Sequence, residues 1–210
     1  RDAKESVPAL IAVFRHSPRP AARLQAICTL EGLQALDGEL LVAAMADADP
    51  SVRRHAIRLS EPLLATDAAV VDGVLQLVED DDPQVQLQLA YTLGASADPR
   101  VPTALARIAA RNSADPYILA GMWSSVSKAN VAAVMRVMLE QASHGELKPS
   151  LLPRAIRLIA EFGDASDLLA VAKSLQAVAA LDDAEWQLAA AEVLEQSRRR
   201  KAAVAEIQQL

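Results

Sequence analysis

The chain has 210 residues and a formal net charge of −6, which disfavours nucleic acid and anionic membrane surfaces as partners because both require a basic face. Hydrophobic residues make up 52% of the chain and aromatic residues only 3%. The core must therefore come from Ala, Leu, Val and Ile, and Ala and Leu are the best helix formers. The single cysteine, Cys28, excludes an intramolecular disulfide.

No apolar run approaches the roughly 20 residues that cross a bilayer, so we expect no membrane insertion of this segment. The chain begins at Arg1 rather than Met, and we expect it to be a fragment of a larger multidomain protein. The lack of a visible signal peptide therefore carries little weight, and the sequence leaves the compartment open.

Prolines recur along the chain at a fixed spacing. Pro50, Pro83 and Pro116 are 33 residues apart, each follows Asp, and each precedes Val or Ile by two positions. The same step reaches Pro149, and Pro20 lies 30 residues before Pro50. A fixed period of 20 to 50 residues indicates an architecture of stacked repeats.

Each period is predicted to contain two helices. Asp37 is expected to cap one helix, and Asp49 a second that starts with Pro50, where the missing N–H costs nothing. Gly163 is expected to end the tenth helix as a C-cap. The predicted helices are 5–15, 20–36, 39–46, 50–63, 68–78, 83–94, 98–111, 115–128, 130–142, 149–162, 164–181 and 183–200. They group into the repeats 5–36, 37–66, 67–97, 98–129, 130–163 and 164–200 of a single domain, 1–210.

Aligning the second helices by the period shows a face that is apolar in nearly every repeat. Its three columns are Val52, Val85, Ile118, Leu151 and Ala184; then Ala56, Leu89, Met122, Ala155 and Leu188; then Ser60, Leu93, Val126, Ile159 and Glu192, with Ala22, Ala26 and Leu30 from the first repeat. Steps of four residues stay on one stripe of a helix. This stripe is predicted to be buried between neighbouring repeats.

The motif Asp-Pro-Ser-Val-Arg at 49–53, with Ala56 three residues after Arg53, resembles that of HEAT repeats. The ankyrin and tetratricopeptide patterns are absent. The resemblance implies an all-α, HEAT-like (armadillo-type) right-handed α-solenoid of about six helical pairs. The later repeats depart from the motif, because Gln86 and Leu119 stand at the position of Arg53.

Three runs are similar to the HEAT segment of large bacterial proteins described as PVC-type heme-binding proteins or putative membrane-bound dehydrogenases. They are RLQAICTLEGLQALD at 23–37, RLSEPLL at 58–64 and DDDPQVQLQLAYTLG at 80–94. In that family a β-propeller precedes the repeats and a c-type cytochrome domain follows them, which implies a periplasmic or exported location. This chain has no Cys-x-x-Cys-His motif. We therefore expect no cofactor and no catalysis here, and any dehydrogenase chemistry would belong to neighbouring domains.

Candidate reactive groups are few. His16, His55 and His144 fall in different repeats, without metal-ligand spacing to Cys28. Cys28 and His55 are expected on adjacent helices, but no third group or oxyanion donor accompanies them. The acidic run 79–82 lacks the alternating ligands and central Gly of a calcium loop, so a solvated turn with a helix cap is favoured. The basic run 198–201 is more typical of a polar helix tail than of a partner contact.

The remaining candidate is a surface. Second helices of HEAT arrays usually line the concave face, and two polar columns flank the buried stripe there. Aromatic residues in the fourth repeat add potential binding hot spots, although for Trp123 we slightly favour a core position in the space left by Gly121 and Ala120. The candidate partner surface comprises Gln25, His55, Arg58, Gln88, Tyr91, Tyr117, Trp123, Arg154 and Arg157.

These features favour a non-catalytic scaffold for protein–protein or interdomain interaction within a dehydrogenase-like, heme-binding multidomain protein. The alternative is a free-standing HEAT protein that binds a small ligand or acts as a bilin-lyase-like enzyme. A DNA-glycosylase-like role is disfavoured by the acidic charge.

Overall fold

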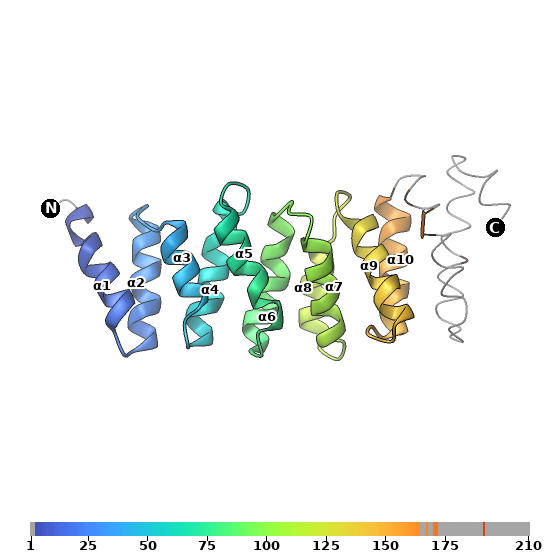
Figure 1. The fold of residues 1–210 in the computed structure, drawn as a ribbon, viewed down its shortest axis with the longest axis horizontal. Helices are drawn as coiled ribbons and strands as arrows, with labels where there is room; N and C mark the ends of the chain where they lie inside the picture. The colour runs from blue at the N-terminus through green and yellow to red at the C-terminus, as the bar shows by residue number, and fades with distance from the viewer. Residues whose placement is uncertain (1–2, 164–166, 168–169, 172–190, 192–210) are drawn as a thin grey trace. The chain divides into compact units, whose positions relative to one another are not determined.

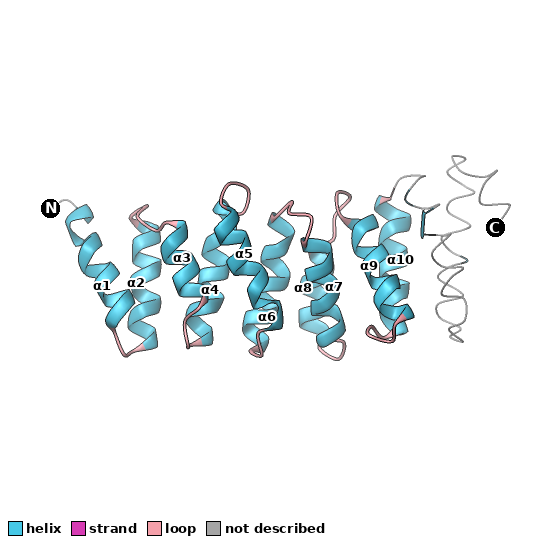
Figure 2. Cartoon of the chain, viewed as in Figure 1, coloured by secondary structure: helices cyan, strands magenta, loops and turns pink. Residues whose placement is uncertain are grey.

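The computed structural model describes residues 3–163, 167, 170–171 and 191, and this part of the chain consists of helices joined by loops and turns, without strands (Figure 1, Figure 2). The α-helices are α1 (Val7–His16), α2 (Pro20–Gly32), α3 (Gly38–Met45), α4 (Pro50–Ser60), α5 (Ala68–Gln76), α6 (Pro83–Thr92), α7 (Val101–Arg111), α8 (Pro116–Ser124), α9 (Val131–Ser143) and α10 (Leu152–Phe162). Short 3-10 helices are η1 (Ala3–Ser6), η2 (Glu61–Leu63), η3 (Leu77–Glu79), η4 (Leu93–Ala95) and η5 (Pro149–Leu151).

The chain divides into two compact units, Arg1–Val101 and Pro102–Leu210. In the N-terminal unit α1 packs on α2 and α3 on α4, so that consecutive helices pair. Second helices also pack on one another, α2 on α4 and α4 on α6, while α3 packs on α5 in the other layer. In the C-terminal unit α9 packs on α10. Each unit is a stretch of α-solenoid, and most of the predicted sixth pair, including Trp186, lies outside the described residues.

Aspartate caps start the helices where the sequence predicts them. The Asp37 carboxylate accepts a hydrogen bond from the Leu40 N–H at 2.9 Å, and the Asp49 carboxylate accepts one from the Ser51 N–H at 2.9 Å. Asp67, Asp82 and Asp115 cap α5, α6 and α8 in the same way. Each cap satisfies N–H groups that have no partner inside the helix.

The predicted buried stripe is confirmed in the described repeats. Val52, Ala56 and Ser60 of α4 are fully buried, and Val85, Leu89 and Leu93 repeat the pattern at α6. The equivalents in α8 and α10 are buried as well, whereas Ala22 in the first repeat is half-buried. The sixth-repeat members Ala184, Leu188 and Glu192 lie outside the described residues. The opposite face of α4 and of α6 is therefore accessible to solvent.

Several helix ends differ from the predicted form. Helix α7 begins at Val101 rather than at 98, and α8 ends at Ser124 rather than near 128. Gly163 is the C-cap of α10, as predicted, but its φ is −67° rather than in the left-handed region. It is needed for a different reason, since a Cβ there would lie 2.5 Å from the Ile159 carbonyl oxygen. The second predicted helix, 20–36, is too long, because α2 ends at Gly32 and Gln34 adopts φ 56°.

Gln34→Gly is expected to stabilise the N-terminal unit. The left-handed conformation costs a non-glycine residue roughly 1–2 kcal/mol, and glycine adopts it without a Cβ clash. Glycine is also more flexible in the unfolded chain, so the net gain should be about 1 kcal/mol. Urea unfolding followed by circular dichroism measures it. Gln34→Ala is the matched control and should give no gain; an equal gain from Ala would rule out the backbone explanation.

Candidate functional site

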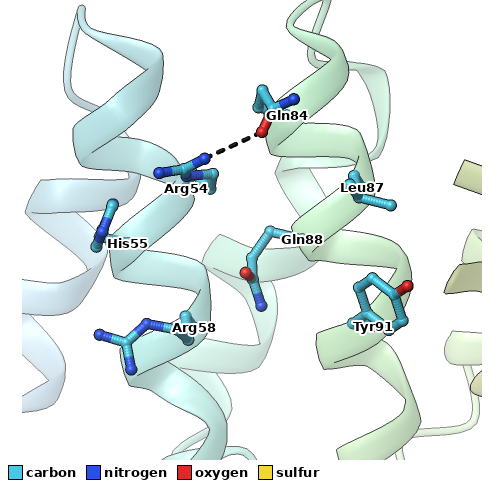
Figure 3. A pocket seen from close by; sticks show the side chains of 7 residues that line it. All are labelled: Arg54, His55, Arg58, Gln84, Leu87, Gln88 and Tyr91. Carbon is cyan, nitrogen blue, oxygen red and sulfur yellow. Dashed lines mark hydrogen bonds between the residues drawn. The ribbon is translucent and has the colours of Figure 1, made fainter. Parts of the chain in front are cut away.

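A shallow depression of about 210 Å³ lies on the exposed face between α4 and α6 (Figure 3). Helix α4 contributes Arg54, His55 and Arg58, and helix α6 contributes Gln84, Leu87, Gln88 and Tyr91. These positions are spaced by three and four residues, so they share one face of each helix. The opposite face of each helix carries the buried stripe, so the lining residues are directed toward solvent.

Hydrogen bonds order several of these side chains. Arg54 donates from Nη1 to the Gln84 Oε1 at 3.0 Å, which joins α4 to α6 across the upper part of the depression in Figure 3. His55 Nδ1 lies 2.8 Å from the Ser51 carbonyl oxygen. Because a carbonyl oxygen can only accept, Nδ1 must carry the proton, and Nε2 is the ring nitrogen left for a ligand.

Two consecutive hydrogen bonds, here called the relay, hold the side chain of Gln88. Its Nε2 donates to the Thr92 Oγ1 at 3.1 Å, and the Thr92 hydroxyl donates to the Glu61 Oε1 at 2.8 Å. Thr92 is fully buried, so the relay fixes the amide of Gln88 between the two helices. The glutamine thus presents an oriented polar group to the middle of the depression.

The depression is cationic. None of its lining residues is acidic, and among the described residues neither Arg54 nor Arg58 forms an ion pair. In Figure 3, His55 and Arg58 point away from α6, whereas Arg54 reaches toward it. Tyr91, at the α6 side, is 50% exposed. The site combines two guanidinium groups, an imidazole, amides and an exposed aromatic ring.

The hypothesis of a Cys28 nucleophile finds no support in this geometry. Burial raises the pKa of the Cys28 thiol, and the nearby charge of Arg58 only partly offsets it. The thiolate is the reactive form, so a raised pKa lowers its population at neutral pH. His55 meanwhile directs Nδ1 to its own helix. Among the described residues no cluster of three His, Cys, Asp or Glu side chains could hold a metal ion.

Four of the nine residues of the predicted partner surface line this depression: His55, Arg58, Gln88 and Tyr91. Gln25 is exposed on α2, outside it. In the C-terminal unit Tyr117 is 75% exposed, Trp123 is half-buried, and Arg154 and Arg157 are exposed. The sequence interpretation missed Arg54, Gln84 and Leu87. Each lies four residues before a predicted member, so a step back by one helical turn would have found them.

A second arrangement links consecutive repeats of the N-terminal unit. Arg23 donates from Nε and Nη2 to the two carboxylate oxygens of Asp47, at 2.7 and 2.6 Å. Arg53 binds Asp80 in the same bidentate way, at 2.7 and 2.9 Å. Arg53 also donates to the Asp47 carbonyl oxygen at 3.0 Å. The two pairs therefore form one continuous Arg–Asp ladder, defined by Arg23, Asp47, Arg53 and Asp80.

The ladder changes form at the third repeat. Gln86 replaces the arginine, and its Nε2 donates to the carbonyl oxygens of Leu77, Val78 and Asp80 at 3.1, 2.9 and 3.0 Å. In the acidic run 79–82 the predicted helix cap is confirmed, because Asp82 caps α6. The side chain of Asp80, however, is buried and pairs with Arg53 rather than facing solvent. The carboxylates of Asp80 and Asp82, which a calcium loop would need as ligands, are therefore engaged in other contacts.

Acid is expected to weaken the ladder. Burial raises the pKa of Asp47. The hydrogen bonds from Arg23 and from the Asp49 N–H, together with the charges of Arg23 and Arg53, lower it by more than burial raises it, so the pKa lies below the ordinary 3.8. The folded pKa is thus below the unfolded one, so the stabilisation is present above about pH 3.8 and is lost as pH falls through the folded pKa. Urea midpoints measured from pH 5 to 2.5 should fall, and should fall less in Asp47→Asn. An identical slope in the variant would contradict the assignment.

Comparison with known proteins agrees with the repeat assignment. Residues 38–122, which span α3 to most of α8, match the family described as HEAT repeats. Two crystal structures, each of an engineered protein, show a distant similarity to the chain. One is 17% identical, with 93% of this chain and 90% of that chain covered, at a TM-score of 0.47. The other is 18% identical, with 93% and 54% covered, at a TM-score of 0.45.

No curated protein matches the chain. In the described part of the chain, none of the helices has the length and apolar character required to span a membrane.

Proposed function

We propose that this chain is a non-catalytic HEAT-repeat scaffold that binds a protein partner through the exposed face of α2, α4 and α6. The observation that carries the proposal is the depression between α4 and α6, where residues from two repeats converge on a rigid helical support. Repeat arrays bind through extended surfaces of this kind, because each repeat contributes a few side chains to one continuous face.

The chemistry of the face fits a protein partner. Tyr91 and the arginines belong to the residue types that carry most binding energy at protein interfaces. The volume of about 210 Å³ is below the roughly 300–1,000 Å³ of small-molecule sites, and suits one or two side chains of a partner.

The resemblance of the runs at 23–37, 58–64 and 80–94 extends the proposal. The scaffold would be the HEAT segment of a dehydrogenase-like, heme-binding multidomain protein, periplasmic or exported, and its partner would be a neighbouring domain of the same chain. The test is to read the gene on both sides of this segment. A β-propeller upstream and a Cys-x-x-Cys-His motif downstream support this extension. The extension fails if neither is encoded, while the scaffold itself is unaffected.

The scaffold proposal is tested by selecting 12-residue peptides from a phage-displayed random library on the immobilised chain. Peptides should be enriched, should shift amide resonances of α2, α4 and α6, and should bind less tightly to Tyr91→Ala. Val13→Ala, which truncates a 41%-exposed side chain of α1, is the control and should bind normally. Biliverdin and duplex DNA are measured in parallel. No enriched peptide, or tighter binding of either of those two ligands, would overturn the proposal.

A further inference from the structure

The α4–α6 depression has a charge opposite to that of the unit that carries it, and this suggests what it binds. We propose that it takes an acidic segment of the partner, with a carboxylate side chain held by Arg54 and Arg58 on α4 and an apolar side chain placed against Leu87 and Tyr91 on α6. The proposal rests on the scaffold function above and specifies the chemistry of the partner.

The first argument is charge. Residues 1–101 contain nine Lys and Arg side chains and fifteen Asp and Glu side chains, which accounts for a formal charge of −6. The structure places many of these carboxylates at helix ends, as caps such as Asp49 and Asp82 and as the ladder residues Asp47 and Asp80. The depression contains none. A cationic site on an acidic unit selects a small anionic group and repels a polyanion.

The second argument is the geometry of the receptors. Arg54 and Arg58 are one helical turn apart on the exposed face of α4. Arg54 reaches toward α6 and Arg58 points away from it (Figure 3), so a carboxylate held by both lies over α4, between the two guanidinium groups. Gln84 presents a neutral oxygen to Arg54, which orients the guanidinium without neutralising its charge. The planar fork of arginine donors matches the two oxygens of a carboxylate.

The third argument is spacing. Packed helices lie about 8–10 Å apart, and an extended peptide advances about 3.3 Å per residue. A strand crossing from α4 to α6 therefore uses about three residues, which places an acidic side chain over Arg54 and Arg58 and an apolar one near Leu87 and Tyr91. The motif expected in the partner is Glu-x-x-Leu or a close variant with Asp or an aromatic residue.

The experiment uses three pools of 10-residue peptides that carry Glu-x-x-Leu, Gln-x-x-Leu or Glu-x-x-Ser at fixed central positions. Each pool is titrated into the ¹⁵N-labelled chain while the arginine Nε–Hε resonances are followed. The Glu-x-x-Leu pool should bind at least about tenfold more tightly than either other pool and should shift the resonances of Arg54 and Arg58. Sodium acetate and duplex DNA serve as separate arms.

The variant is Arg54→Gln combined with Arg58→Gln, and its matched control is Arg19→Gln, which removes an exposed charge outside the depression. The double variant should lose the preference for Glu over Gln, and the control should keep it. Arg58 is exposed and Arg54 is half-buried, and neither forms an ion pair among the described residues. Folding, checked by thermal melting, should therefore change little.

The outcomes separate the two proposals. If the Glu and Gln pools bind equally and Tyr91→Ala still weakens them, the acidic specificity is wrong and the scaffold function stands. If no pool and no phage-selected peptide shifts α2, α4 or α6, both fail. Equal losses in the double variant and in Arg19→Gln, acetate shifts as large as the peptide shifts, or tighter binding of DNA would also overturn the carboxylate assignment.

Discussion

Leu89→Asp is expected to lower the free energy of unfolding of the N-terminal unit by several kcal/mol, whereas Gln88→Asp should cost about 1 kcal/mol or less. The two residues are adjacent in α6, yet Leu89 is fully buried and Gln88 is half-buried at the depression. A carboxylate at 89 would be enclosed between repeats without a cationic partner. At 88 it would reach solvent and lose one hydrogen bond, to Thr92.

Urea unfolding monitored by helical circular dichroism measures both changes on the same scale. A loss of several kcal/mol is a large share of the 5–15 kcal/mol that typically stabilises a domain, so Leu89→Asp could leave the unit partly unfolded without denaturant. Leu89→Ala then provides a smaller step, expected to cost about 2–5 kcal/mol through the cavity that it creates. Equal costs for the substitutions at 88 and 89 would mean that the register of α6 is wrong.

The buried stripe was predictable because burial in a repeat array is periodic. Val52, Val85 and Ile118 are separated by the same step in sequence and occupy the same environment in space, so the alignment alone identifies them. Helix starts were predictable for a local reason: Asp49 and Asp82 cap helices whose first residue is proline. In both cases the signal and its cause lie within a few residues of one another.

The remaining features depend on contacts that the period does not encode. Arg23 and Asp47 are 24 residues apart, whereas Arg53 and Asp80 are 27 apart, so no fixed offset reveals the ladder. The left-handed Gln34 could not be identified either, since sequence signals for such a turn favour Gly or Asn. The depression could not be predicted without the register between α4 and α6, and this register depends on the packing of the whole interface.

Arg53→Ala is expected to destabilise the N-terminal unit by about 2–4 kcal/mol, more than Ala substitution at an exposed arginine. Its partner Asp80 has a side chain only 5% exposed, and removal of one member of a buried pair leaves the other charge without compensation. Two carbonyl oxygens, of Asp47 and Ala48, lose a donor at the same time. Arg53→Lys should recover only part of the loss, because an ammonium cannot reproduce the bidentate contact and the carbonyl contacts together.

The chain itself contains a neutral alternative to this pair, and it provides the sharpest test of the ladder. Gln86 occupies the position of Arg53 one period later, and Ser113 stands 27 residues after it, the separation of Arg53 from Asp80. Gln86 satisfies three carbonyl oxygens of its own repeat and needs no carboxylate. Arg53→Gln alone should therefore be costly because Asp80 remains charged, whereas Arg53→Gln with Asp80→Ser should be less destabilising than the sum of the two single changes.

The coupling is measured as a double-mutant cycle from urea unfolding at pH 7, with an expected interaction of at least about 1 kcal/mol. Asp80 also accepts a hydrogen bond from the Asp82 N–H at 2.9 Å, so Asp80→Asn is included to keep that turn while removing the charge. If the cost of the double substitution equals the sum of the single costs, the carboxylate of Asp80 is stabilised by the turn rather than by Arg53. The ladder would then be a consequence of the stacked repeats and not one of the interactions that hold them together.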